Sequence, residues 1–359
     1  LDPLRLRFDD TTLEGNLRLP SFEGPKVRYR LSLDTIDLDR YLPPKEKSVE
    51  GKQAPAPQAA TPGQAAAGAA AELPLESLRR LDLDGTLTIG ELKAFQLRSR
   101  NITLTTRASG GKIRLHPASA ELYEGKYEGD FRLDVRGRQP AFSMNEKVIA
   151  IQAGPLLRDL TGKAAMTGRG EVQVKLTGKG LDPEQIKPTL NGHLSLSFRD
   201  GAIAGIDIPR MIREAQARLK GQTLPAANGP GQTDFTSLTA TAAVKEGVLL
   251  NDDLRLQSPL LRAAGRGKVD LPRNRIDYLL TVKLVGTLEG EGGKPMESLR
   301  GLAIPLRIQG PLPSPRYRVE LDRVLKKTVE RKVRKRLEKH LLPQLQKRFG
   351  DRLEGLFGR

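Results

Sequence analysis

The sequence predicts a mostly β protein: a long antiparallel meander of strands, a few short helices and a basic amphipathic helix at the C-terminal end. Three observations predict this class. Apolar and polar residues alternate with a period of two in many segments, glycine-containing turns separate those segments, and a strand–turn–strand unit recurs along the chain.

Alternation is clearest in residues 27–33, where Val, Tyr and two Leu occupy the odd positions and Arg28, Arg30 and Ser32 lie between them. Period-2 alternation indicates a strand with one apolar face and one solvated face. Asp84-Gly85 and Asp200-Gly201 have the composition of tight turns between such strands. The same alternation occupies residues 4–8, 131–135, 172–176, 194–198, 278–284 and 302–308.

An internal repeat supports the meander. Residues 111–135 align without gaps on residues 247–271, so that Gly111 matches Gly247 and Gly129 matches Gly265. The repeated unit reads as strand, glycine turn, strand, and several such units side by side build a long sheet.

One internal helix is expected at residues 208–220. Asp207 can cap it, Pro209 suits its first turn, and Gly221 can close its C-terminal end. Its expected apolar face consists of Ile208, Ile212, Ala215 and Leu219.

The C-terminal tail is the second expected helix. Residues 323–359 hold 13 Lys and Arg against 4 Asp and Glu, and apolar residues recur every four positions from Leu321 to Leu341. This period makes the apolar stripe wind around the helix, and a basic amphipathic helix suits an anionic membrane surface. We therefore expect salt-sensitive membrane binding, with Lys326, Lys327, Arg331, Lys335 and Lys339 as the contacting residues.

Composition divides the chain into four parts. Residues 44–72 are rich in Ala, Pro, Gln and Gly, which predicts a disordered linker. The other parts are a β segment at 1–43 that joins the main sheet, a repeat-built sheet at 73–322, and the tail at 323–359. The chain begins at Leu1 without the apolar run of a signal sequence, and we expect it to be a piece of a longer protein.

Composition also excludes several kinds of chemistry. The chain of 359 residues contains no Cys, and its three His lie far apart, so we expect no metal site and no cysteine nucleophile. No phosphate-binding loop of the G-x-x-x-x-G-K-[ST] type and no G-x-S-x-G motif is present. Asp34, Asp37 and Asp39 lack the spacing of a calcium loop and read as solvated residues. We expect no enzyme and no cofactor.

Nucleic acid is also a poor match, although the formal net charge is +17. Aromatic residues make up only 4% of the chain, Trp is absent, and the basic tail offers few rings for base stacking. The basic residues therefore indicate lipid headgroups rather than nucleic acid as their partner.

Several short motifs follow one another along residues 1–320. They are Phe8–Gly15, Ser32–Pro44, Leu83–Gly90, Leu115–Gly125, Thr189–Gly192, Asp200–Asp207, Val248–Leu254, Ser258–Leu261 and Gly265–Leu271. Each motif is short, but their succession resembles the C-terminal half of AsmA-family envelope proteins.

The resemblance implies an elongated, curved β-sheet that forms a trough for acyl chains, as in bridge-like lipid transfer proteins. It further implies the periplasm of a diderm bacterium, an N-terminal inner-membrane anchor outside this chain, phospholipids and unidentified envelope proteins as partners, and a role in outer-membrane biogenesis. The apolar residues expected to contact lipid are Leu31, Leu33, Leu133, Leu194, Leu196, Phe198, Leu280 and Val282.

Two other functions remain open from the residues alone. A closed β core would make the protein a non-enzymatic assembly scaffold for outer-membrane proteins. An enzyme acting on lipids or glycans is a weaker alternative, because the sequence offers no candidate nucleophile–base pair.

Overall fold

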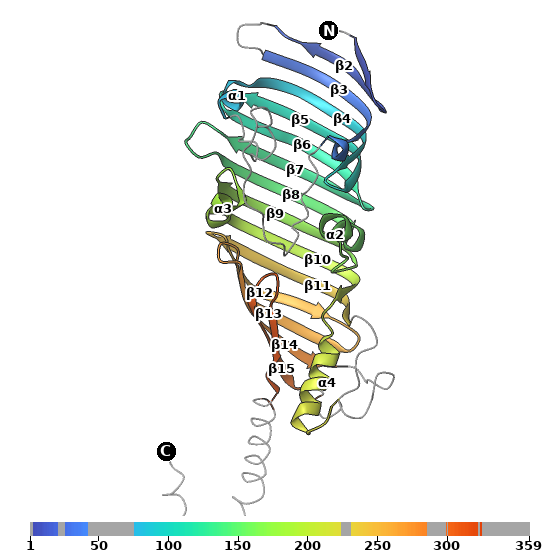
Figure 1. Ribbon diagram of the computed structural model, residues 1–359, viewed down its shortest axis with the longest axis vertical. Coiled ribbons are helices and arrows are strands. Elements are labelled where there is room, and N and C mark those ends of the chain that lie inside the picture. The colour runs from blue at the N-terminus through green and yellow to red at the C-terminus, as the bar shows by residue number, and fades with distance from the viewer. Residues whose placement is uncertain are drawn as a thin grey trace, which may run out of the picture. The chain divides into compact units, whose positions relative to one another are not determined.

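A computed structural model describes residues 3–20, 26–41, 75–223, 231–285 and 301–321, together with residues 299 and 324. Within these residues, sixteen strands follow one another in sequence order, each hydrogen-bonded to the next, in an open sheet (Figure 1). Every pair whose register is described is antiparallel except β3 with β4. The predicted antiparallel meander is confirmed.

The chain divides into two compact units. Unit 1 comprises Leu1–Phe198 with Ala242–Leu249, and unit 2 comprises Arg199–Thr241 with Leu250–Arg359. The strands of unit 1 curve as a sheet and are β1 (Leu4–Phe8), β2 (Thr11–Arg18), β3 (Lys26–Asp37), β4 (Asp82–Ala94), β5 (Leu97–Ser109), β6 (Lys112–Leu122), β7 (Gly125–Asp134), β8 (Ala141–Gln152) and β9 (Arg169–Lys179).

Three strands contribute residues to both units: β10 (Asn191–Ala204), β11 (Gln232–Lys245) and β12 (Val248–Gln257). Unit 2 adds β13 (Leu261–Asp270), β14 (Arg275–Leu284), β15 (Ala303–Pro311) and β16 (Arg316–Val319).

Tight turns connect several pairs of antiparallel strands. Gly110 and Gly111 join β5 to β6 with φ of +54° and +77°, and Glu246 and Gly247 join β11 to β12 with φ of +49° and +75°. Two successive positive φ angles are typical of type I′ turns, whose twist matches that of paired strands. The aligned glycines of the internal repeat thus hold equivalent positions, and its two copies form the hairpins β6–β7 and β12–β13.

The parallel pair β3–β4 places Leu31 beside Leu87 and Leu33 beside Ile89. A parallel pair requires a crossover connection, and residues 38–81 provide ample length for one. This connection contains η1 (Leu38–Arg40) and α1 (Leu75–Arg80). The predicted linker at 44–72 and the predicted tail, apart from Val324, lie outside the described residues.

Short helices lie near the ends of the strands in unit 1. The helix α2 (Ala153–Thr161) follows β8, while α3 (Pro183–Ile186) and η2 (Lys187–Thr189) connect β9 to β10. Arg79 of α1 donates from Nε to the carbonyl oxygen of Val135 at 2.8 Å and from its terminal nitrogen to that of Gly137 at 3.0 Å. Val135 is fully buried, so α1 covers the end of β7.

Unit 2 contains the predicted internal helix, α4 (Ile208–Leu219). The Asp207 carboxylate accepts a hydrogen bond from the backbone N–H of Arg210 at 2.8 Å, as expected for an N-cap. The backbone N–H of Ile208 also donates to the Thr233 hydroxyl of β11 at 3.0 Å, which fixes the start of the helix on the sheet.

The buried face of α4 differs from the predicted one at its C-terminal end. Ile208 and Ile212 are buried as expected, but Leu219 is 45% exposed and Gln216 is buried instead. Leu219 lies in the last turn of the helix, directly before the C-cap Lys220.

Unit 2 has a closed hydrophobic core. The strands β13, β14 and β15 align Ala263, Val282 and Ile304 in one cross-strand row, and all three are buried. The large side chains of unit 2 that lose essentially all contact with solvent are Ile212, Leu261, Val282, Leu284, Leu299, Ile304, Leu306 and Leu321.

We predict that truncating Leu306 in this core, as Leu306→Ala, lowers the free energy of unfolding by roughly 2–5 kcal/mol because it leaves a cavity. Leu87→Ala in β4 should lower the free energy of unfolding by less than about half of that amount, because the Leu87 side chain is partly exposed and solvent already reaches it. Urea unfolding followed by far-UV circular dichroism measures both. Equal losses would contradict the difference in packing between the units.

Candidate functional site

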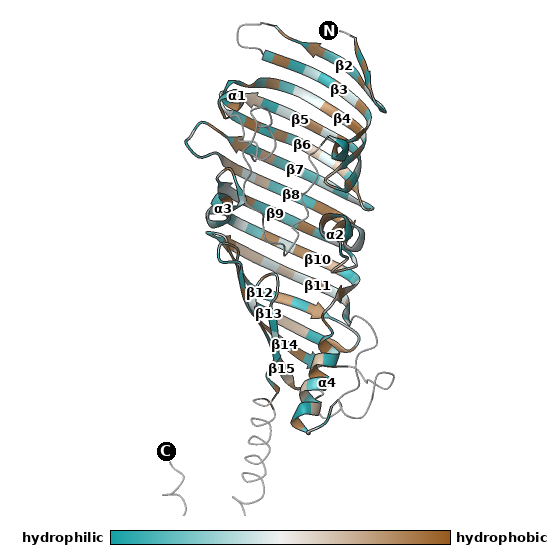
Figure 2. Cartoon of the chain, in the orientation of Figure 1, coloured by the Kyte–Doolittle hydropathy of each residue, from teal (hydrophilic) through white to brown (hydrophobic). Residues whose placement is uncertain are grey.

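One face of the unit 1 sheet is apolar over many neighbouring strands. Side chains alternate between the two faces of a sheet, so residues in register on adjacent strands share a face. Figure 2 shows the corresponding alternation of hydrophobic and hydrophilic residues along the strands. One row of this apolar face, from β4 to β9, consists of Leu83, Ala108, Ile113, Leu133, Phe142 and Gly178.

The residues predicted in unit 1 to contact lipid fall on this face. Leu31 and Leu33 of β3 lie beside Leu87 and Ile89 of β4, and Leu133 belongs to the row described above. In β10, the ring of Phe198 lies against Gly170 of β9. Because residues two apart share a face, Leu194 and Leu196 lie on the same side as Phe198.

The two predicted residues of unit 2 have different surroundings. Val282 is fully buried between Ala263 and Ile304, and Leu280 is partly exposed beside Gly265 and Leu306. Val282 therefore belongs to the closed core and offers no surface to a ligand.

The apolar face of unit 1 remains accessible. Leu31, Leu33, Leu133, Leu194 and Leu196 are all partly exposed, although each lies within a strand paired on both sides. Phe198 is 5% exposed. Among described residues with large side chains that lose essentially all contact with solvent, unit 1 supplies Val135 and Ile151, and unit 2 supplies the remainder.

Glycines under aromatic rings shape this face. A Cβ atom at Gly85 would lie 2.5 Å from Cδ1 of Tyr29 on the neighbouring strand, and one at Gly178 would lie 2.7 Å from Cε1 of Phe142. Any side chain there would displace the ring. The ring lies over the glycine and shields its backbone from solvent.

A polar pair interrupts the apolar face. Tyr127 of β7 and Glu146 of β8 flank Gly129, and the Tyr127 hydroxyl donates to the Glu146 carboxylate at 2.6 Å. Burial, together with this hydrogen bond, raises the pKa of the Tyr127 phenol well above its usual value. The phenol therefore stays protonated and satisfies a carboxylate that lies between apolar neighbours.

The opposite face of the sheet is charged. Arg107, Arg114 and Arg132 are in register on β5, β6 and β7. Asp130 accepts hydrogen bonds from Arg114 at 2.9 and 2.8 Å and from Arg132 at 3.3 and 2.8 Å. These bonds, above all those from Arg114, hold the pKa of the Asp130 carboxyl well below its usual range. The carboxylate thereby relieves the repulsion between two neighbouring guanidinium groups.

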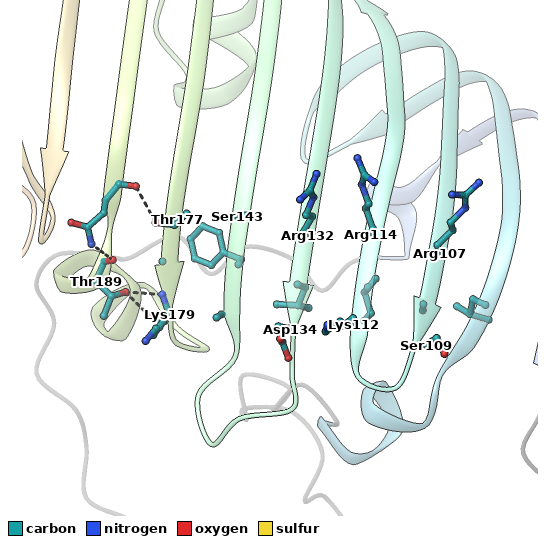
Figure 3. Close-up of a pocket in the computed structure, with 18 of the residues that line it drawn as sticks. Arg107, Ser109, Lys112, Arg114, Arg132, Asp134, Ser143, Thr177, Lys179 and Thr189 are labelled. Atoms are coloured by element: carbon teal, nitrogen blue, oxygen red, sulfur yellow. Dashed lines mark hydrogen bonds between the residues drawn. The ribbon is translucent and has the colours of Figure 1, made fainter.

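A cavity of about 1180 Å³ lies at one end of strands β4 to β9. It is lined by the apolar row, by charged residues of the adjacent rows and by Thr189 and Asn191 near the start of β10. Figure 3 shows Arg107, Arg114 and Arg132 side by side on three neighbouring strands near this cavity. Its volume exceeds the roughly 300–1,000 Å³ of sites for small ligands, so a larger amphiphilic molecule has room there.

Nothing in the described part of the chain groups three or more His, Asp or Glu side chains in a geometry suited to a metal ion. The predicted membrane-contact residues, Lys326, Lys327, Arg331, Lys335 and Lys339, lie outside that part. Of the helices whose residues are described, none has the length and apolarity needed to cross a membrane.

The sequence alone did not indicate the cavity or the Tyr127–Glu146 pair. Both depend on which strands lie side by side, and alternation gives the face of a residue but not its cross-strand neighbour. The signal that could have drawn attention to the cavity is the charge pattern of Lys112-Ile113-Arg114 and Arg132-Leu133-Asp134, in which an apolar residue lies between two charged ones.

Residues 8–254 match the model of the AsmA family, which is more than half of the chain. The strand order and the accessible apolar face described above belong largely to this matched region. The chain is therefore a member of the AsmA family, as its motifs suggested.

A comparison with curated proteins finds Protein AsmA of Escherichia coli strain K12, which is 22% identical over 331 residues. The match covers 91% of this chain and 53% of the relative, so the chain spans about half the length of that protein. No solved structure matches the chain significantly.

The ion pairs of Asp130 should make the stability of the fold depend on pH. Because its pKa is lowered in the folded state, the carboxylate stabilises the fold fully above its unfolded pKa of about 3.9. This stabilisation is lost as the pH falls from there towards the folded pKa. We expect Asp130→Asn to lower the urea midpoint at pH 7 and the difference from wild type to shrink below pH 4. A difference that stays constant down to pH 2.5 would contradict this assignment.

Proposed function

We propose that this protein binds and conveys phospholipid acyl chains along the apolar face of unit 1 and thereby supports outer-membrane biogenesis. Family membership supports the broad class, an envelope protein with a role in outer-membrane assembly or lipid transport. The observation that carries the finer proposal is the partial exposure of an apolar face that is continuous across neighbouring strands.

The mechanism is passive shielding of acyl chains from water. Each Å² of apolar surface removed from water contributes about 25 cal/mol, so a row of aliphatic and aromatic side chains can hold a chain without directional bonds. Non-directional contacts let the chain slide along the face, because they do not fix it in one position or orientation. The proposal requires no catalytic residue and no cofactor.

The location of the protein follows the same proposal. The described sheet would act in the periplasm of a diderm bacterium, tethered to the inner membrane by a segment outside this chain, with other envelope proteins as partners. The basic tail, Lys326 to Lys339 in particular, would hold one end of the protein against anionic headgroups.

A scaffold role is the second candidate, and unit 2 favours it in part, because its apolar residues form a closed core. In a scaffold, an apolar face would serve protein packing rather than lipid. The two roles differ in what touches the side chains of β10.

Leu196→Asp separates the two roles. On an open face the carboxylate reaches solvent, so we expect a nearly unchanged melting temperature but much less co-purified phospholipid. Ser197→Asp, which adds the same charge on the opposite face, is the matched control and should retain phospholipid. Lipid is measured by mass spectrometry of the extracted protein.

A photo-crosslinking amino acid tests directly whether lipid contacts the side chains of β10. At position 196 we expect labelled lipid, and at position 197 none. If Leu196→Asp unfolds the protein and the crosslinker at 196 captures only protein, the scaffold role is correct at this strand.

A further inference from the structure

The end of the unit 1 sheet that holds the cavity differs in charge from the other end of the same strands. At the cavity end, the residues lining the cavity and the adjoining β7–β8 loop include eight Lys and Arg against four Asp and Glu. At the other end, the residues lining the corresponding depression include five Lys and Arg against four Asp and Glu. Of the eight cations at the cavity end, Arg28 pairs with Asp82 at 3.3 Å, and we call the other seven the basic rim: Arg107, Lys112, Arg114, Arg132, Arg136, Arg138 and Lys179.

The cations of the basic rim differ in how far neighbouring carboxylates already occupy them. Asp130 pairs with Arg114 and Arg132, and Asp134 pairs with Arg136, whose guanidinium lowers the pKa of the Asp134 carboxyl to about 2. Arg138 and Lys179 are exposed, and neither side chain forms an ion pair with another described residue.

Arg107 is also available in part. Its side chain is 73% exposed, and its Nε lies 3.9 Å from Asp84, a long separation for an ion pair. Arg107, Arg114 and Arg132 lie on the face opposite the apolar row, so the cations nearest the acyl chains are those at the strand ends and in the β7–β8 loop.

The basic rim adjoins the apolar face. Leu133 and Phe142, in register on β7 and β8, line the same cavity as Lys112 and Lys179, the terminal residues of β6 and β9. Long basic side chains at strand ends can reach over the edge of a sheet while their methylene stems cover apolar surface. Apolar contacts and cations therefore meet at one edge, as the two ends of an amphiphile require.

We propose that the basic rim binds the phosphate of a phospholipid whose acyl chains lie on the apolar face. This inference rests on the proposed function and adds the headgroup class and the side of the sheet on which the headgroup lies. Strands in a sheet are about 4.8 Å apart, so the rim between β5 and β9 extends over roughly 20 Å. That length accommodates successive headgroup positions along the path of a moving lipid.

The test uses uptake of two fluorescent lipids from vesicles of digalactosyldiacylglycerol, a bilayer lipid that is uncharged and carries no phosphate. Phosphatidylglycerol carries the phosphate, and diacylglycerol has the same acyl chains without it. The wild-type chain should take up phosphatidylglycerol in preference to diacylglycerol. Arg138→Glu combined with Lys179→Glu should lower phosphatidylglycerol uptake by about tenfold and leave diacylglycerol uptake unchanged.

The matched control reverses two exposed charges at the other end of the same strands, Arg98→Glu with Lys126→Glu. It changes the net charge equally and should preserve the preference for phosphatidylglycerol. Far-UV circular dichroism and melting temperature check that both double variants fold.

The outcomes distinguish this inference from the function on which it rests. Equal uptake of both lipids by the wild-type chain, or equal effects of the two double variants, would overturn the basic rim while leaving acyl-chain binding intact. Uptake of neither lipid would overturn both. Inorganic phosphate at millimolar concentration should not compete with phosphatidylglycerol, and full competition would show a site for free phosphate instead.

Discussion

A sheet whose strands alternate apolar and polar residues either packs its apolar face against other parts of the protein or leaves that face exposed to solvent and ligands. The two units of this chain meet the constraint differently. In unit 2, Val282, Ile304 and Leu306 are buried in a closed core. In unit 1, residues such as Leu133 and Leu196 stay partly exposed. Exposed apolar area is unfavourable in water, which is the physical basis for the proposal that this face binds acyl chains.

Keeping such a face open requires a sheet that is stable without a second layer. Unit 1 gains stability from backbone pairing between successive strands and from charge pairs on its polar face, such as Asp130 with Arg114. Aromatic rings over glycines, as in Phe198 over Gly170, protect the backbone locally. The Tyr127–Glu146 pair shows that a polar group is tolerated on the apolar face when its partner is supplied by the next strand.

Alternation in the sequence was sufficient to predict the strands and the shared face of Leu31, Leu33, Leu133, Leu194 and Leu196, because the period of a strand is two. It could not show that Val282 is buried, since periodicity gives a face but not what covers it. It also did not reveal the parallel pairing of β3 with β4, because the pattern within a strand is the same for either direction. The cavity and the basic rim depend on register, which the turns and bulges between consecutive strands set and which alternation does not reveal.

The most direct test of the central claim is solvent access to the two apolar faces. The chain contains no Cys, so single substitutions Leu133→Cys, Leu196→Cys and Val282→Cys can each be labelled alone. The measurement is the rate of modification by a water-soluble maleimide, in lipid-free protein and after incubation with phosphatidylglycerol vesicles. We expect rapid modification at 133 and 196 that lipid suppresses, and slow modification at 282 under both conditions. Slow modification at all three positions without lipid, or no protection by lipid at 133 and 196, would contradict it.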